Sequence, residues 1–136
     1  MDLPLLEWLD TYTFPAEARY ADLDYARRAY RKLAADLIAC GTTRVAMFST
    51  LHTDATLILM EELERSGVTG YVGKVNMDRN GGKNLQETTE ESVSETLRWL
   101  DQCHFEHIKP ILTPRFTPSC TDALMEQLGR IAAERG

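Results

Sequence analysis

The chain alternates helix-like and strand-like segments over most of its 136 residues. Residues 22–40 have helical periodicity, with apolar side chains on one face and arginines and lysines on the other, and Gly41 ends this stretch. Three units follow, and each consists of a short apolar strand and then an amphipathic helix. The strands are expected at residues 43–50, 70–77 and 108–113, and the helices at residues 53–66, 88–103 and from about residue 119 onward. This alternation predicts an α/β fold of three consecutive βα units with parallel strands and right-handed crossovers.

The residues before this alternation predict an N-terminal helical segment. Residues 3–9 are apolar and aromatic, and Pro4 suits the first turn of a helix. Residues 14–17 are expected to form a turn, because Pro15 disfavours helical geometry at Phe14. Three parallel strands are too few for a closed barrel, and an open sheet has unpaired edges. The sequence therefore predicts a single-domain fragment of a larger α/β structure, or a chain whose sheet a partner completes.

Charge and composition exclude some classes of partner. The formal net charge is −6, whereas nucleic acids and anionic membranes favour basic surfaces. No apolar run approaches the ~20 residues of a membrane span, and the acidic N-terminus lacks the basic region of a secretion signal. The cysteines, Cys40, Cys103 and Cys120, are odd in number and form no CxxC motif. We therefore expect a cytoplasmic protein that binds neither nucleic acid nor membrane.

Functional side chains of parallel α/β folds gather at the carboxyl ends of the strands. Residues 49–54, 76–80 and 113–116 follow the three predicted strands. In the first segment, His52 and Asp54 have two interpretations: a general base with its orienting carboxylate, or a polar loop residue beside a helix cap. His104 and His107 fall at the opposite end of the predicted sheet, so we expect no functional role for them.

The third segment, Thr113-Pro114-Arg115-Phe116, is the most informative of the three. Arg115 offers a planar fork of hydrogen-bond donors, and Phe116 offers an aromatic face. This pair suits a planar heterocycle that carries a carbonyl group, since an arginine fork reads O6 and N7 of guanine in DNA grooves. The alternative is that Arg115 binds loop carbonyls or a neighbouring carboxylate.

Several chemical signatures are absent from the sequence. It contains no HxH, no HExxH and no CxxC motif, which are usual zinc-ligand patterns. It also lacks the PCxxC motif that completes the signature of the cytidine-deaminase class, a Walker loop and a GxGxxG motif. We therefore assign no metal ligand and no catalytic residue to this chain.

The whole sequence resembles the zinc-dependent guanine deaminases of the amidohydrolase superfamily. The resemblance includes the run Leu3-Pro4-Leu5-Leu6-Glu7-Trp8-Leu9 and the run from Lys109 to Phe116, with further matches in order between them. The matching stretches are residues 3–9, 12–17, 41–43, 51–54, 72–78, 87–92 and 109–116. The resemblance implies that residues 1–136 belong to the catalytic (β/α)8 barrel, a TIM barrel, and supply approximately its second to fourth strands.

The resemblance also implies an activity, the hydrolytic deamination of guanine to xanthine and ammonia by a zinc-bound water. It implies that Arg115 binds the purine carbonyl, that Phe116 packs on the ring, and that Trp8 and Leu6 line the base pocket. The zinc ligands of the family lie on segments that have no counterpart here, so we expect this chain to be inactive alone. The complete enzyme is expected to be a homodimer.

Two other functions remain open at this stage. A related adenosine-type or S-adenosylhomocysteine-type aminohydrolase has a similar tryptophan-containing stretch after its first strand, although an arginine suited to a carbonyl favours guanine over adenine. A non-catalytic α/β module that binds a small molecule or a partner chain is the other alternative.

Overall fold

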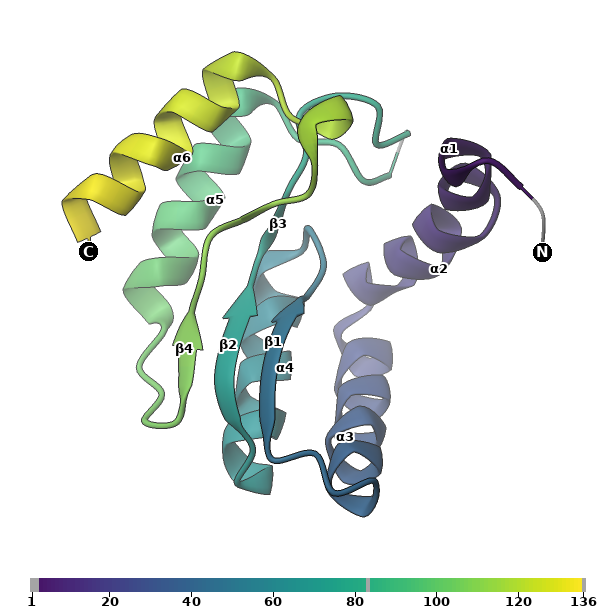
Figure 1. Ribbon diagram of the computed structural model, residues 1–136, viewed down its shortest axis with the longest axis vertical. Coiled ribbons are helices and arrows are strands. Elements are labelled where there is room, and N and C mark those ends of the chain that lie inside the picture. The colour runs from purple at the N-terminus through teal and green to yellow at the C-terminus, as the bar shows by residue number, and fades with distance from the viewer. Residues whose placement is uncertain (1–2, 83, 136) are drawn as a thin grey trace.

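The computed structural model describes residues 3–82 and 84–135, and these residues form an open parallel sheet with helices behind it (Figure 1). The N-terminal segment is helical: α1 (Leu5–Trp8), a π-helical turn (Leu9–Thr13), α2 (Phe14–Ala18), a 3-10 turn (Arg19–Ala21) and α3 (Leu23–Ala39). The rest alternates: β1 (Arg44–Phe48), α4 (Thr53–Ser66), β2 (Thr69–Gly73), β3 (Val75–Asn76), α5 (Thr89–Gln102), β4 (Ile108–Pro110), β5 (Thr113–Pro114), a 3-10 turn (Thr117–Ser119) and α6 (Asp122–Arg135).

The strands pair in parallel and in sequence order. The order of the main sheet is β1-β2-β4, and β3 pairs with β5 to continue the second and third strands. Ala46 lies opposite Tyr71, and Tyr71 lies opposite Lys109. Three strands were expected at residues 43–50, 70–77 and 108–113. The structure confirms them, but the second strand is interrupted at Lys74 and the third after Pro110.

Short-range signals fix the helix ends. The Asp22 carboxylate accepts hydrogen bonds from the backbone N–H groups of Asp24 and Tyr25 and caps α3. Thr88 and Glu91 form a reciprocal capping box at the start of α5. Gly67 ends α4 in the left-handed conformation, at φ 82°, which glycine adopts without steric cost. These contacts begin α3 and α5 and end α4 where the periodicity predicts these helix ends.

One expectation for the N-terminal segment was wrong. Residues 14–17 were expected to form a turn, but they form α2, and Phe14 before the proline has helical geometry with φ −63° and ψ −43°. Pro15 lies at the start of this helix, where a missing backbone N–H removes no intrahelical hydrogen bond. The buried Phe14 ring, which packs with Leu9, stabilises this geometry against the local preference.

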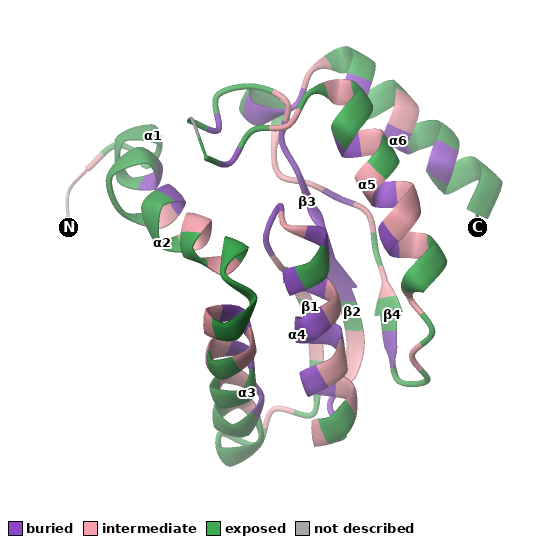
Figure 2. Cartoon of the chain, turned by 180° about the vertical axis from the view of Figure 1, so that it is seen from behind, coloured by how far each residue is buried: buried purple, intermediate pink, exposed green. Residues whose placement is uncertain are grey.

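The helices cover one face of the sheet. Figure 2 shows α4 lying against the strands, and this helix has buried residues along most of its length. The largest apolar cluster lies between this helix, α3 and the sheet, and includes Tyr30, Leu59, Val72 and Trp99. Alternate residues of β1, Val45 and Met47, also pack against it.

The other face of the sheet has no helix over it among the described residues (Figure 1). Large apolar side chains there are solvent-exposed, with Phe48 56%, Tyr71 51% and Ile111 42% accessible. Exposed apolar side chains gathered on one sheet face indicate a surface that another part of a protein covers. The inner wall of a β/α barrel has this character, because side chains from all of its strands meet there.

A carboxylate fixes the amino end of β4. Glu64, near the end of α4, accepts hydrogen bonds from the backbone N–H groups of Glu106, His107 and Ile108 at 2.9–3.1 Å. Partial burial opposes ionisation, but these three donors outweigh it and lower the pKa of Glu64 below its ordinary value of 4.5. His104 and His107 lie in this loop and are exposed, at the end of the sheet opposite the arginine of the 113–116 segment.

We expect Glu64→Ala to lower the free energy of unfolding by about 1–2 kcal/mol, since three backbone donors lose a charged acceptor and gain water instead. Because the folded-state pKa is lowered, the contribution of Glu64 is complete above pH 4.5 and is lost as pH falls through the folded-state value. Urea unfolding at pH 7 and at pH 3 measures both effects. The control is Glu61→Ala, which removes an exposed partner of Arg27; an equal loss in the two variants at pH 7 would contradict the prediction.

Candidate functional site

The N-terminal helical segment lies against the carboxyl ends of the strands. Leu9 and Phe14 of this segment form a buried cluster with Val75 and Met77. Val75 belongs to β3, and Met77 is the first residue after that strand. Leu51, from the loop after β1, joins the same cluster. The packing of these apolar residues brings the helical segment of residues 5–18 to the strand ends, where functional groups of parallel α/β folds are found.

Arg115 lies at this end of the sheet, directly after β5. Its backbone N–H donates to the carbonyl of Asn76, at the end of β3, at 3.3 Å. Its Nη1 donates to Glu17 Oε2 at 2.6 Å, and its guanidinium carbon lies 5.1 Å from the centre of the Phe14 ring. The side chains of Arg115 and Glu17 are only 16% and 12% accessible. The sequence left open whether Arg115 faces a ligand or a carboxylate, and the structure supplies the carboxylate.

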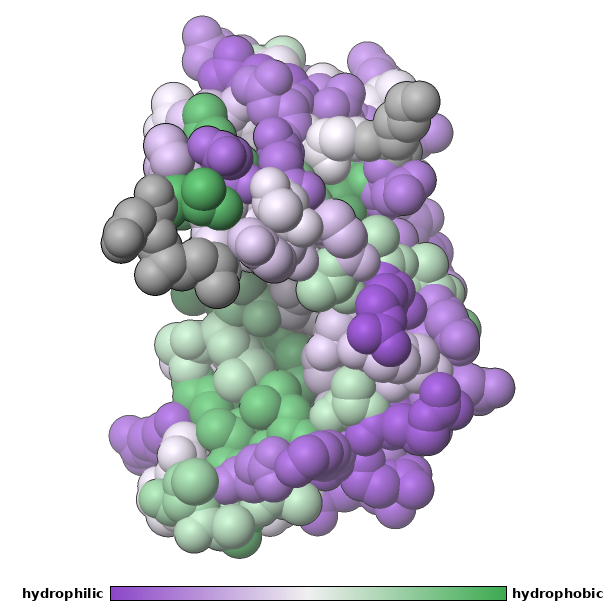
Figure 3. Space-filling view, turned by 90° about the vertical axis from the view of Figure 1, so that its right-hand side faces the viewer, coloured by the Kyte–Doolittle hydropathy of each residue, from purple (hydrophilic) through white to green (hydrophobic). Residues whose placement is uncertain are grey.

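The other predicted site residues are distributed around this point. Phe116 is partly buried and packs against the cluster that contains Leu9 and Leu51. Trp8 lines a cavity of about 490 Å³ together with Glu17, Phe48 and Thr50. Figure 3 views the molecule from this side and shows a hollow with hydrophobic residues in it.

Leu6 is not brought to this cavity. Its side chain is 55% exposed, and it is not among the residues that line the hollow beside Trp8. Arg115 thus contacts Glu17 and Phe14. Trp8 and Glu17 line the same cavity. Sequence reasoning missed Glu17 and Phe14, because the stretch that contains them was interpreted as a turn.

The structure contradicts the roles expected for Asp54 in the His52-Thr53-Asp54 segment, and His52 lies in the loop before α4. His52 is the residue that precedes α4, and no side chain caps this helix. Asp54 binds neither the helix terminus nor His52; its carboxylate accepts from Arg98 Nη1 at 2.8 Å. Burial lowers the pKa of His52, although the Glu17 carboxylate raises it, and the Nε2 atom is buried without a hydrogen-bond partner among the described residues.

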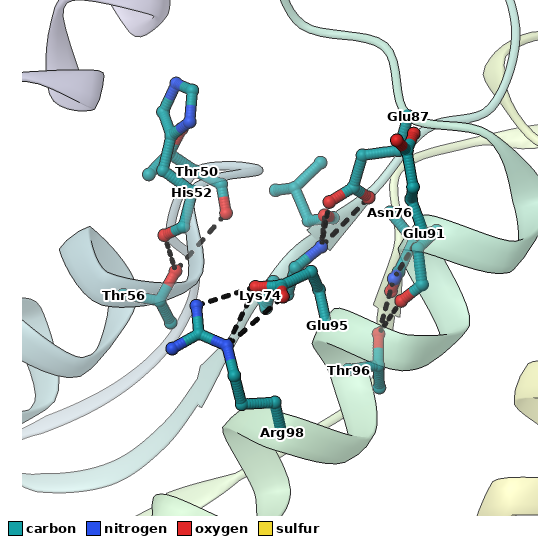
Figure 4. A network of polar contacts seen from close by, with 12 residues as sticks. Thr50, His52, Thr56, Lys74, Asn76, Glu87, Glu91, Glu95, Thr96 and Arg98 are labelled. Carbon is teal, nitrogen blue, oxygen red and sulfur yellow. Dashed lines mark hydrogen bonds and ion pairs between the residues drawn. The ribbon is translucent and has the colours of Figure 1, made fainter.

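A buried ion pair behind the strand ends was not foreseen either. Lys74 separates β2 from β3, is 1% exposed, and its Nζ donates to both oxygens of Glu87 at 2.9 and 3.0 Å (Figure 4). Arg98 binds Glu95 beside it at 2.7 Å. These side chains lie on the side of the sheet that faces α5, so the pair links the second strand to the loop before that helix.

The second loop at the strand ends is held by Asp78. Its carboxylate accepts from the backbone N–H of Thr121 at 2.7 Å and from the hydroxyl of Thr89 at 2.7 Å. These hydrogen bonds, and one from the Thr121 hydroxyl, lower the pKa of Asp78 against the opposing effect of burial. Asp78 therefore connects the starts of α5 and α6 and is occupied by structural contacts.

The resemblance implies a metal, which in proteins is held by several His, Cys, Asp or Glu side chains. Nowhere in residues 3–82 and 84–135 do three or more such side chains come together in an arrangement that could hold a metal ion. The described residues therefore do not fit a metal centre, and we derive no catalytic step through a metal from them. Within the same ranges, no helix is long and apolar enough to span a membrane.

Comparison with known proteins identifies similar chains. The chain is 48% identical to guanine deaminase of Mus musculus over 97% of its own length, and 45% identical to that of Homo sapiens over 99%. The guanine deaminase of Escherichia coli is 34% identical over 96% of the chain. The chain spans about 30% of the length of each of these relatives.

Solved structures agree with these matches. A guanine deaminase from C. acetobutylicum, crystallised with guanine bound in its active site, superposes with a TM-score of 0.93 at 46% identity and covers 98% of this chain and 32% of its own. The E. coli enzyme superposes with a TM-score of 0.87. The expected fold class, three consecutive βα units of a (β/α)8 barrel after a helical segment, is confirmed.

The model of the Amidohydrolase family matches residues 1–136, and the chain therefore belongs to that family, whose members are generally metal-dependent hydrolases.

Proposed function

We propose that this chain is the purine-recognising part of a guanine deaminase, in which residues 1–136 supply the second to fourth strands of the catalytic barrel. The reaction replaces the 2-amino group of guanine with a carbonyl oxygen from water and releases ammonia, which yields xanthine. The proposal is supported by the similarity to guanine deaminases along nearly the whole chain.

The observation that carries the proposal is the position of Arg115. A guanidinium at the carboxyl end of a barrel strand, largely buried and held by Glu17, is suited to donate two hydrogen bonds to O6 and N7 of a purine. Adenine has an amino group in place of O6, which donates and would face the arginine donors. The arrangement therefore favours guanine over adenine.

The remaining predicted site residues have supporting roles in this proposal. Phe116 packs on the purine ring, and Trp8 closes the pocket from the cavity side. Leu6 is retained as a pocket residue on the basis of the resemblance alone, since it is exposed in this structure. No residue of this chain is proposed to act as acid, base or nucleophile.

The proposal extends to the complete protein. The metal is zinc, held by residues other than those described here, and when bound it supplies a water activated for attack. The complete enzyme is a cytoplasmic homodimer that binds neither nucleic acid nor membrane, and its small-molecule partner is guanine.

The test is an assay of the full-length protein that carries this chain, with guanine, adenine, adenosine and S-adenosylhomocysteine as substrates. We expect xanthine and ammonia from guanine, and a kcat/KM at least about 100-fold above that for the adenine compounds. Preference for an adenine compound would instead identify a related aminohydrolase. Binding of guanine without turnover of any substrate would favour the non-catalytic module.

A further inference from the structure

The pair of Glu17 and Arg115 joins residues that lie 98 positions apart in the sequence. Glu17 is on α2 in the N-terminal segment, and Arg115 follows β5. The Glu17 side chain is 12% accessible and the Arg115 side chain 16% accessible, so both are largely buried. The distance between Arg115 Nη1 and Glu17 Oε2 is 2.6 Å. An ion pair at this distance and burial has charge-assisted strength and little screening.

Within the described residues, the Glu17 side chain has one hydrogen-bonded contact, which is to Arg115. Among residues 3–82 and 84–135, Glu17 Oε1 is buried without a hydrogen-bond partner. The carboxylate therefore does not cap α2 or tie it to another strand. Its interaction is directed at the guanidinium of Arg115.

The guanidinium is restrained from two directions. Glu17 holds Nη1, and the Phe14 ring lies 5.1 Å from the guanidinium carbon. Phe14 and Glu17 are three residues apart on α2 and so lie on one face of that helix. Within the described residues, Nε and Nη2 of Arg115 have no hydrogen-bond partner, so these donors remain for a ligand.

We propose that Glu17 is a positioning residue, which fixes the guanidinium of Arg115 so that its remaining donors meet the 6-carbonyl side of a bound purine. This inference rests on the proposed function and extends it to a residue that does not itself touch the substrate. Arginine has a long flexible side chain, and a carboxylate that holds one of its nitrogens reduces the freedom lost when the ligand binds. Glu17 also supplies the negative charge that lets the cation be buried.

The test measures ligand binding in the full-length enzyme with Glu17→Gln, a variant of nearly the same shape that lacks the charge. The probes are hypoxanthine, which has the 6-carbonyl but no 2-amino group to be hydrolysed, and unsubstituted purine, which lacks both. We expect Glu17→Gln to raise the Ki of hypoxanthine about 10- to 100-fold and to change the Ki of purine by no more than about twofold. Glu17→Asp, which keeps the charge, should restore part of the difference.

Two controls separate positioning from a structural role. Glu7→Gln makes the same chemical change on the exposed helix α1 and should leave both Ki values unchanged. In an Arg115→Ala background, Glu17→Gln should have no further effect on the Ki of hypoxanthine, because the residue acts through the arginine.

The inference fails if Glu17→Gln raises both Ki values equally, which would indicate a structural role, or if it leaves the hypoxanthine Ki unchanged. It also fails if hypoxanthine binds more tightly, since Glu17 would then hold Arg115 away from the ligand. Failure of the proposed function is a different result: the unmodified enzyme would not convert guanine to xanthine.

Discussion

Arg115→Ala in the full-length enzyme is expected to lower kcat/KM for guanine by about 1,000-fold. The proposed fork donates two hydrogen bonds from a charged group, each worth about 1.5–3 kcal/mol, and three decades correspond to about 4 kcal/mol. The bonds form in a pocket from which water is largely excluded, as the 16% accessibility of the side chain indicates, so water cannot replace them fully. The measurement is steady-state formation of xanthine over a range of guanine concentrations.

Arg115→Lys provides a graded comparison. Lysine keeps the charge but presents a point donor in place of a planar fork, so we expect a loss of about 100-fold. Arg135→Ala removes an arginine from an exposed pair with Asp101 and should leave kcat/KM unchanged. Because Arg115→Ala leaves Glu17 buried without its partner, thermal unfolding of each variant must accompany the assay. A folded Arg115→Ala enzyme with unaltered kcat/KM would remove this residue from the site.

The strand segments and their parallel direction could be predicted because their causes are local. Period-3.6 and apolar strand patterns identify the elements, and Asp22, Thr88 and Gly67 end or begin helices through contacts within a few residues. Parallel pairing then follows from the helical crossovers. The position of Arg115 at the strand ends followed from the same topology.

The neighbours of Arg115 could not be predicted in this way. Pro15 argued for a turn, yet buried apolar contacts of Phe14 hold a helix there and place Glu17 against a residue 98 positions later. Likewise, the assignment of His52 and Asp54 considered only sequence neighbours, whereas Asp54 pairs with Arg98, 44 positions away. Tertiary contacts of charged side chains have no short-range signature.

The buried ion pair between Lys74, which separates β2 from β3, and Glu87 is expected to have a large effect on stability. The side chains of Lys74 and Glu87 are 0% and 11% exposed. Burial lowers the pKa of the lysine and raises the pKa of the glutamate, and the attraction between the two charges opposes both shifts. We expect Glu87→Ala to lower the free energy of unfolding by about 3–5 kcal/mol, because it leaves a buried ammonium without its counter-charge. Urea and thermal unfolding of the full-length protein at pH 7 measure this loss.

The double variant Lys74→Met, Glu87→Leu tests the cause of that loss. If the uncompensated charge is responsible, replacing both partners with apolar side chains should return the free energy of unfolding to within about 1 kcal/mol of the unmodified protein. The matched surface control is Asp36→Ala, which removes the carboxylate partner of Lys32. This lysine–carboxylate pair is 2.7 Å apart, and its side chains are 76% and 58% exposed. Asp36→Ala should therefore lower the free energy of unfolding by no more than about 0.5 kcal/mol. Equal losses for Glu87→Ala and Asp36→Ala would show that burial adds nothing to the lysine–carboxylate pair. A double variant as unstable as Glu87→Ala would show that the loss comes from the shape of the side chains and not from their charge.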